Sequence, residues 1–186
     1  MKRPIVKYGD AVLRAKGKRV AKADEKIRAL ASDMLETMHA ANGVGLAAQQ
    51  VGEAVQLTVL DVTDVEDRPS TLRLNGKDVE LERAMPLVLL NPTLTLGEET
   101  EQGPEGCLSF PEITADIERA IAVSAKAETL DGESVDIEAT GLLARALQHE
   151  VDHLNGILFI DRMSSVAKAS LGSRLKRLQK ETQRSE

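Results

Sequence analysis

Two histidines and a glutamate in the last third of the chain have the types and spacing of a metal site. The stretch QHEVDHLNG, residues 148–156, places His149 and His153 four residues apart with Glu150 between them. Residues i and i+4 of an α-helix lie on the same face, so both imidazoles can bind one metal ion. In this HExxH arrangement the glutamate is placed to handle a proton of metal-bound water. The pattern also arises by chance, so its significance depends on a third ligand.

The candidates downstream of this motif are weak. The long HExxHxxGxxH pattern would need a third histidine at position 159, which is Phe159. The first downstream glutamate, Glu181, lies in a basic tail, and Asp161 follows an apolar stretch. Upstream, His39 stands at the end of a predicted helix, where the helix dipole favours a histidine without any metal.

Cys107 is therefore the favoured third ligand. It is the only cysteine of the chain and lies in the sequence EGCLS, where the glycine lets the backbone approach another group closely. A lone cysteine is usually a small buried apolar residue. Beside two histidines that lack a third partner, however, a thiolate would complete an open, tetrahedral Cys-His-His catalytic set. A zinc endopeptidase and a non-catalytic, metal-stabilised binding module are the alternative functions.

The apolar periodicity predicts three helices that surround or contain these residues. The first covers residues 24–41, with Asp24 as N-cap and Asn42-Gly43 as its end, and the second, about 142–154, carries the HExxH motif. The third is a basic amphipathic helix or tail at residues 164–186. Its six basic and two acidic residues give it a charge of +4 within a chain of net charge −6. Such a segment is usually a solvated face, but it also suits an anionic partner such as RNA.

The remaining segments predict short strands. Residues 55–62 and 87–92 form two of them, the second ending at Pro92, and hairpins turn at Asn75-Gly76 and Asp131-Gly132. We expect the first hairpin, within residues 63–85, to be a surface insertion. We expect residues 97–106 to form an acidic loop and residues 157–161 to form a short strand or extended exit. The predicted class is α+β: one domain, residues 1–186, with mostly antiparallel sheets packed around the HExxH helix.

The composition argues against several other classes of function and location. Two Phe, one Tyr and no Trp leave too few aromatic side chains for a base-stacking surface, and we expect no DNA partner. A single cysteine fits a reducing compartment. The sequence shows neither an apolar run of membrane-spanning length nor a continuous apolar signal segment near its start. We therefore expect a cytoplasmic protein with no membrane partner.

Three motifs in order resemble the peptide deformylase family. They are GVGLAAQQ at residues 43–50, EGCLS at 105–109 and QHEVDHLNG at 148–156. Their spacing matches that family, as does the amphipathic helix before the first motif, and the resemblance covers essentially the whole chain. It implies hydrolysis of the N-formyl group from the formylmethionine of nascent polypeptides, with release of formate. A metal-bound hydroxide would be the nucleophile, and Glu150 would serve as general base and then as general acid.

The resemblance also implies roles for particular residues. Cys107, His149 and His153 would hold one divalent metal, with Fe(II) the physiological ion and Zn(II) or Ni(II) able to replace it. Gln50 and the backbone N–H of Leu108 would stabilise the oxyanion. The substrate groove or methionine pocket would be lined by Val44, Gly45, Leu142 and Ala146. With nascent formylated peptides as substrate, the basic C-terminal helix becomes a candidate ribosome contact.

Two features depart from the family. Ile113-Thr114 stands where many members carry a basic or aromatic residue that helps to hold the peptide. The segment 63–85 is longer than the corresponding connection in compact members. It would either border the substrate entrance or only decorate the surface.

Overall fold

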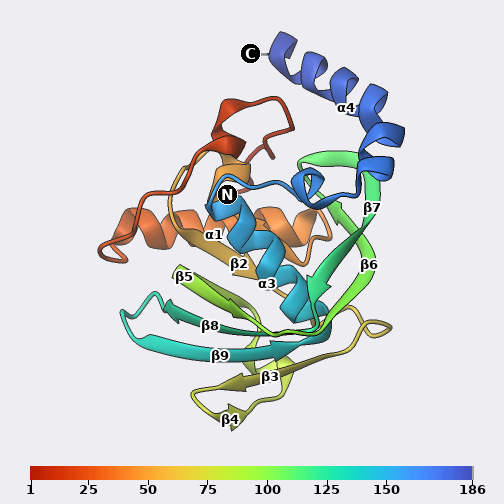
Figure 1. Ribbon diagram of the computed structural model, residues 1–186. Coiled ribbons are helices and arrows are strands. Elements are labelled where there is room, and N and C mark those ends of the chain that lie inside the picture. The colour runs from red at the N-terminus through yellow and green to blue at the C-terminus, as the bar shows by residue number, and fades with distance from the viewer. Residues whose placement is uncertain (186) are drawn as a thin grey trace.

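The main sheet has seven antiparallel strands, and a two-stranded hairpin curves away from it on one side (Figure 1). A computed structural model describes residues 1–185. The order in the main sheet is β1-β2-β5-β8-β9-β3-β4, and β6 pairs with β7. The strands are β1 (Gly45–Ala47), β2 (Leu57–Leu60), β3 (Ser70–Leu74), β4 (Lys77–Asp78), β5 (Leu87–Leu96), β6 (Thr100–Cys107), β7 (Phe110–Ala120), β8 (Ala122–Glu128) and β9 (Ser134–Thr140).

The helices confirm the predicted α+β class. They are α1 (Glu25–Ala40), a short α2 (Leu81–Ala84), α3 (Gly141–Leu154) and α4 (Ser165–Ser185), with single 3₁₀ turns at Ala11–Arg14, Ala48–Val51 and Phe159–Arg162. The N-cap prediction for α1 is confirmed, because the Asp24 side chain accepts a hydrogen bond from the N–H of Ile27. The last residue of the predicted C-terminal tail, Glu186, lies outside the described residues. None of the helices within residues 1–185 combines the length and apolar character needed to cross a membrane.

Both predicted hairpins are present. Asn75 and Gly76 have φ angles of 50° and 79° and join β3 to β4, as a type I′ turn requires. Strand β3 is more than a surface addition, however, because it pairs with β9 and buries Leu72 to 3% exposure. The segment 63–85 thus extends the main sheet.

Three local predictions were wrong. Strand β5 does not end at Pro92 but continues to Leu96, because the proline falls in a register shift where no ladder N–H is needed. The acidic stretch 97–106 forms most of β6, since a two-stranded ribbon leaves one edge unpaired and so tolerates glycine and proline. The predicted exit strand is instead the 3₁₀ turn Phe159–Arg162, which the Asp161 carboxylate closes by accepting the N–H of Leu158 at 3.0 Å.

Helix α3 lies at the centre of the molecule and is buried on nearly all sides (Figure 1). Twelve of its 14 residues are buried, including Arg145, Gln148, His149, Glu150, Asp152 and His153. Leu143 and Leu147 pack against the main sheet in one apolar cluster. Because a buried polar group without a partner is costly, the polar face of α3 must find partners inside the protein.

The beginning of α3 is fixed by the chain that leads into β3. The Pro69 carbonyl accepts the N–H of Leu142 (3.3 Å), and the Ser70 hydroxyl accepts the N–H of Leu143 (2.9 Å). Gly141 makes this contact sterically allowed: its φ is +67°, and a Cβ there would lie 2.0 Å from the Pro69 carbonyl oxygen. Two of the unpaired N–H groups at the N-terminus of α3 are satisfied in this way.

This junction predicts that Gly141→Ala lowers the free energy of unfolding by about 2–4 kcal/mol, from left-handed strain plus steric overlap. Gly132→Ala is the matched control, because Gly132 also has a positive φ (+82°) but has no heavy atom within 4 Å of the place where a Cβ would stand. The control should lose only about 1 kcal/mol. Urea unfolding of both variants measures the difference, and equal losses would contradict the steric account.

Candidate metal centre

The structure brings Cys107, His149 and His153 together. The two histidines project from successive turns of α3, and Cys107 ends strand β6. One ligand atom from each residue lies within 4.8 Å of the others, and the Cys107 Sγ is 3.3 Å from the His153 Nε2. Ligand atoms of a tetrahedral site with metal–sulfur and metal–nitrogen bonds of about 2.3 and 2.0 Å are roughly 3.5 Å apart. The spacing therefore fits one ion.

The other candidate ligands point elsewhere. His39, on the last turn of α1, is half exposed, and its Nε2 lies 2.9 Å from the Asp61 carboxylate. Asp161 pairs with Arg14, and Glu181 pairs with Arg177 on α4. None of these three residues belongs to the group formed by Cys107 and the two α3 histidines.

The two histidines of the group differ in their electrostatic surroundings. Burial lowers the pKa of His153 well below its ordinary value, so its ring is neutral and can offer a lone pair. Burial also opposes a charge on His149, yet hydrogen bonds to Cys107 and Glu105 raise its pKa well above the ordinary value. The two rings thus differ in their affinity for a proton, but a sulfur with two imidazoles is a donor set that suits a first-row transition metal.

Glu150 lies beside this group in a dry environment. Its side chain is buried, and burial raises its pKa to about 7, a value suited to taking up and releasing a proton. The backbone of β1 lies directly against it, because a Cβ on Gly45 would be 2.6 Å from the Glu150 Oε1. Only a glycine at position 45 leaves the carboxyl group in this place.

Gln50 is held in a single orientation. Its Oε1 accepts the N–H of Ala47 at 3.0 Å, which directs the amide nitrogen toward Ser109 Oγ (3.1 Å) and Cys107 Sγ (3.5 Å). The neighbouring Leu108 is positioned through its carbonyl, which accepts a hydrogen bond from Lys7 Nζ at 2.9 Å. The Gln50 amide and the Leu108 peptide thus flank the cysteine.

A pocket of ≈ 410 Å³ opens beside the group. Its lining includes Cys107, His149 and Glu150, together with all the residues that the resemblance assigned to substrate or oxyanion: Val44, Gly45, Gln50, Leu108, Leu142 and Ala146. The sequence-predicted site residues therefore gather around one pocket, apart from His153, which is buried in the Cys-His-His group and is not among the lining residues.

Sequence reasoning missed Glu105. Its Oε1 lies 2.7 Å from the His149 Nδ1, and its carboxylate also accepts hydrogen bonds from the guanidinium groups of Arg119 and Arg145. Burial opposes ionisation of Glu105, but its bonds to His149 and Arg119 outweigh this and lower its pKa to about 2. A carboxylate in this position fixes the ring orientation of a metal-binding histidine. No local signal marked Glu105, because residues 97–106 were expected to form a loop rather than a strand with alternating faces.

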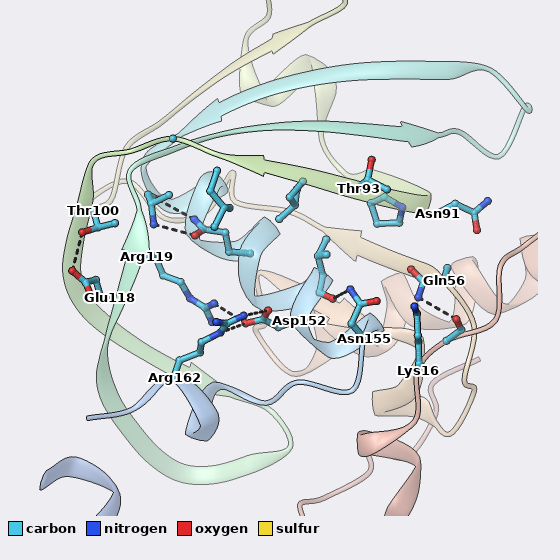
Figure 2. A pocket seen from close by; sticks show the side chains of 18 of the residues that line it. Lys16, Gln56, Asn91, Thr93, Thr100, Glu118, Arg119, Asp152, Asn155 and Arg162 are labelled. Atoms are coloured by element: carbon cyan, nitrogen blue, oxygen red, sulfur yellow. Dashed lines mark hydrogen bonds and ion pairs between the residues drawn. The ribbon is translucent and has the colours of Figure 1, made fainter. Parts of the chain in front are cut away.

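The charged network continues past Glu105 to another face of α3. Arg119 also donates to Asp152 at 2.7 Å, and Arg162 reaches the same carboxylate at 2.9 Å. Figure 2 shows both arginines converging on Asp152 at the wall of a second cavity of ≈ 730 Å³. This larger cavity contains neither the cysteine nor the histidines among its lining residues. The metal-centre pocket is therefore the smaller of the two.

A sulfur and two imidazoles beside a buried glutamate, inside an α+β fold, define a metal-dependent hydrolase. The sequence profile of the family described as "Polypeptide deformylase" matches residues 2–169. The peptide deformylase of Opitutus terrae is 44% identical over 180 residues, which are 96% of this chain and 93% of the relative. The chain belongs to the peptide deformylase family, metallo-hydrolases that remove the N-formyl group from nascent peptides.

Solved structures agree with this assignment. The crystal structure of peptide deformylase from Thermotoga maritima is 40% identical, with a TM-score of 0.75 over 88% of this chain and 99% of that one. Peptide deformylase 1B of Arabidopsis thaliana, crystallised with an inhibitor, is 36% identical, with a TM-score of 0.84 over 100% and 93% of the two chains.

The geometry predicts that Cys107→Ala lowers metal affinity by at least about 100-fold, more than loss of an outer hydrogen-bonding partner costs. Metal content after dialysis against a weak chelator, measured by mass spectrometry of the anaerobically prepared protein, tests this. His39→Ala is the control and should keep the wild-type metal content, because His39 pairs with Asp61 instead. Equal metal content in Cys107→Ala and the wild type would contradict the ligand assignment.

Proposed function

We propose that Cys107, His149 and His153 hold one divalent metal ion and that Glu150 moves the proton while this chain deformylates the N-terminal formylmethionine of nascent polypeptides. The observation that carries the proposal is the convergence of the three ligand atoms within 4.8 Å, beside the buried Glu150 and at the wall of an apolar pocket. We place this reaction in the cytoplasm, where nascent chains are made.

A first-row divalent metal bound to this set would act as a Lewis acid and activate water for attack on the formyl carbon. We propose Fe(II) as the physiological ion, with Zn(II) or Ni(II) able to occupy the same ligands. One thiolate and two imidazoles support a transition metal over Mg²⁺ or Ca²⁺, which prefer oxygen ligands.

The chain's own residues divide the remaining chemistry. Glu150 accepts a proton from the attacking water and delivers it to the departing amide nitrogen, so that the C–N bond breaks into formate and a free amine. The Gln50 amide N–H, directed toward the cysteine by its bond to Ala47, donates to the oxygen that develops negative charge. We propose that the backbone N–H of Leu108 supplies a second donor.

The pocket and the edge of the main sheet position the substrate. We propose that the methionine side chain binds between the apolar side chains of Val44, Leu142 and Ala146, which line the pocket beside His149. Strand β1 is an edge strand of the main sheet. An extended peptide can therefore add to it through main-chain hydrogen bonds, and Gly45 lets the backbone lie close to the catalytic carboxyl group.

We expect Glu150→Gln to lower kcat/KM by about 10²- to 10⁴-fold, the usual contribution of a general acid–base. Formate release from a formyl-Met dipeptide, after anaerobic loading with Fe(II), measures this. Metal content should stay at the wild-type level, since Glu150 is not a proposed ligand. Glu133→Gln, an exposed position in the β8–β9 turn, is the matched control.

The same assay tests the class of substrate. Cleavage of an internal peptide bond, measured in parallel, should be absent, and internal cleavage without formate release would favour an endopeptidase. A Glu150→Gln variant that keeps wild-type turnover would overturn its proposed role.

We further propose that α4 contacts the ribosome. Leu175 is buried against the protein, while the basic residues of the helix are all exposed: Lys168, Arg174, Lys176, Arg177, Lys180 and Arg184. In Figure 1 the end of α4 projects beyond the rest of the molecule. An exposed row of cations on a projecting helix suits the phosphate backbone of RNA.

Replacing Lys176, Lys180 and Arg184 together with glutamine should weaken ribosome binding about tenfold, because phosphate contacts and counterion release are lost. Co-sedimentation with purified ribosomes at two salt concentrations measures the effect. A control variant removes the same charge from Lys77, Arg83 and Lys126, which are exposed elsewhere. Equal losses in both variants would contradict a specific role for α4.

A further inference from the structure

Arg68 is a charged residue at the catalytic pocket that the reaction does not use. It belongs to the connection between β2 and β3 and lines the same pocket as Cys107, His149 and Leu142. Its side chain is partly buried, and within residues 1–185 it makes no hydrogen bond or ion pair with the protein. A guanidinium group that is partly withdrawn from water without a partner can bind an incoming anion at little cost of rearrangement.

The backbone around Arg68 is anchored to the pocket wall. The next two residues, Pro69 and Ser70, bond to the N–H groups of Leu142 and Leu143 at 3.3 and 2.9 Å. Leu142 lines the proposed methionine pocket. The first turn of α3 therefore fixes the backbone next to Arg68, and the position of this residue does not depend on a long unanchored loop.

The distance along α3 between Leu142, beside which Arg68 is anchored, and the metal ligands indicates which part of a peptide Arg68 can reach. Leu142 lies seven residues before His149, so these two lining residues are about 10 Å apart along the axis of α3 at 1.5 Å per residue. An extended peptide advances about 3.4 Å per residue. We take the methionine side chain to enter between Val44, Leu142 and Ala146 and the peptide backbone to leave the pocket past the partly exposed Arg68. With the formyl group at the metal ligands, the second or third residue then comes level with Arg68.

The other charged residues of this pocket are either paired, buried beside the metal ligands, or negative. Glu105 and Arg145 pair with each other at 3.0 Å, and Glu150 is buried beside the metal ligands. Glu112 also lines this pocket, on the β7 wall; Arg174 of α4 donates to its backbone carbonyl, and its exposed side chain adds a negative charge on that side. Arg68 is thus the cation that a substrate meets at the α3 end of the pocket.

We propose that Arg68 is a specificity-determining residue that binds the carboxylate of an acidic side chain at the second or third position of the formylated peptide. The guanidinium fork matches a carboxylate with two parallel N–H donors. This inference rests on the proposed deformylase activity and assigns a function to the segment 63–85: its first part borders the substrate entrance and selects for charge.

The test compares C-terminally amidated peptides that differ in one charge. Formyl-Met-Ala-Glu is compared with formyl-Met-Ala-Lys, and formyl-Met-Glu-Ala with formyl-Met-Lys-Ala, by the ratio of kcat/KM. The wild type should prefer glutamate about fivefold in at least one pair, the factor expected of a partly exposed ion pair. Arg68→Gln should bring that ratio to about 1, Arg68→Glu should invert it, and added salt should reduce it in the wild type.

Arg83→Gln is the matched control, because Arg83 belongs to the same segment but is highly exposed, pairs with Glu80 and does not line the pocket. It should keep the wild-type ratio. A wild-type ratio near 1 in both pairs, or a ratio that Arg68→Gln leaves unchanged, would overturn the inference while formate release continued. Absence of formate release from every peptide would overturn the proposed function itself.

Discussion

The Glu105 carboxylate is the group on which the order of the buried site depends. It accepts hydrogen bonds from Arg119 and Arg145 and contacts the ring of His149 at 2.7 Å. Removing one member of such a buried ionic group typically costs about 3–5 kcal/mol, because the remaining charges lose their partner in a dry interior. The network stabilises the protein only when it is complete. The same interactions that balance these charges also set the direction in which one proposed ligand points.

This constraint explains why α3 lies at the centre of the molecule. Helix α3 carries charged and polar residues on faces that a surface helix would expose, and each face meets a different partner. The β6–β7 hairpin supplies Glu105, Cys107 and Arg119, whereas the turn after α3 supplies Arg162, which reaches Asp152 from the wall of the second cavity (Figure 2). Sequence-distant segments must all be in place before the ligand atoms converge. Folding and assembly of the site are therefore the same process.

Much of this arrangement could be predicted from local signals. Helical periodicity located α1 and α3, the i, i+4 rule placed His149 beside His153, and Asn75-Gly76 identified a hairpin. Elimination among the few other donors favoured Cys107. The strand predictions that were wrong concern segments whose structure depends on pairing with distant residues. Strand β5 continues past Pro92 because of a bulge. Strand β6 forms from a stretch of glycine, proline and acidic residues because β7 pairs with it. The role of Arg119 and the placement of Arg68 likewise have no local signal. Arg119 bonds to Glu105, 14 residues away, and Ser70, which anchors the backbone next to Arg68, bonds to Leu143, 73 residues away.

The two ends of strand β3 have different surroundings, so the segment 63–85 has one part fixed to the pocket and another part remote from it. Pro69 and Ser70 are bonded to α3, whereas the Asn75-Gly76 turn lies at the far end of the strand and includes no residue that lines the pocket beside Cys107. The chain can therefore change in length at that turn without moving the wall of the pocket. Differences in length among related enzymes can be accommodated at this turn. A peptide or label could also be inserted there while the substrate entrance kept its shape.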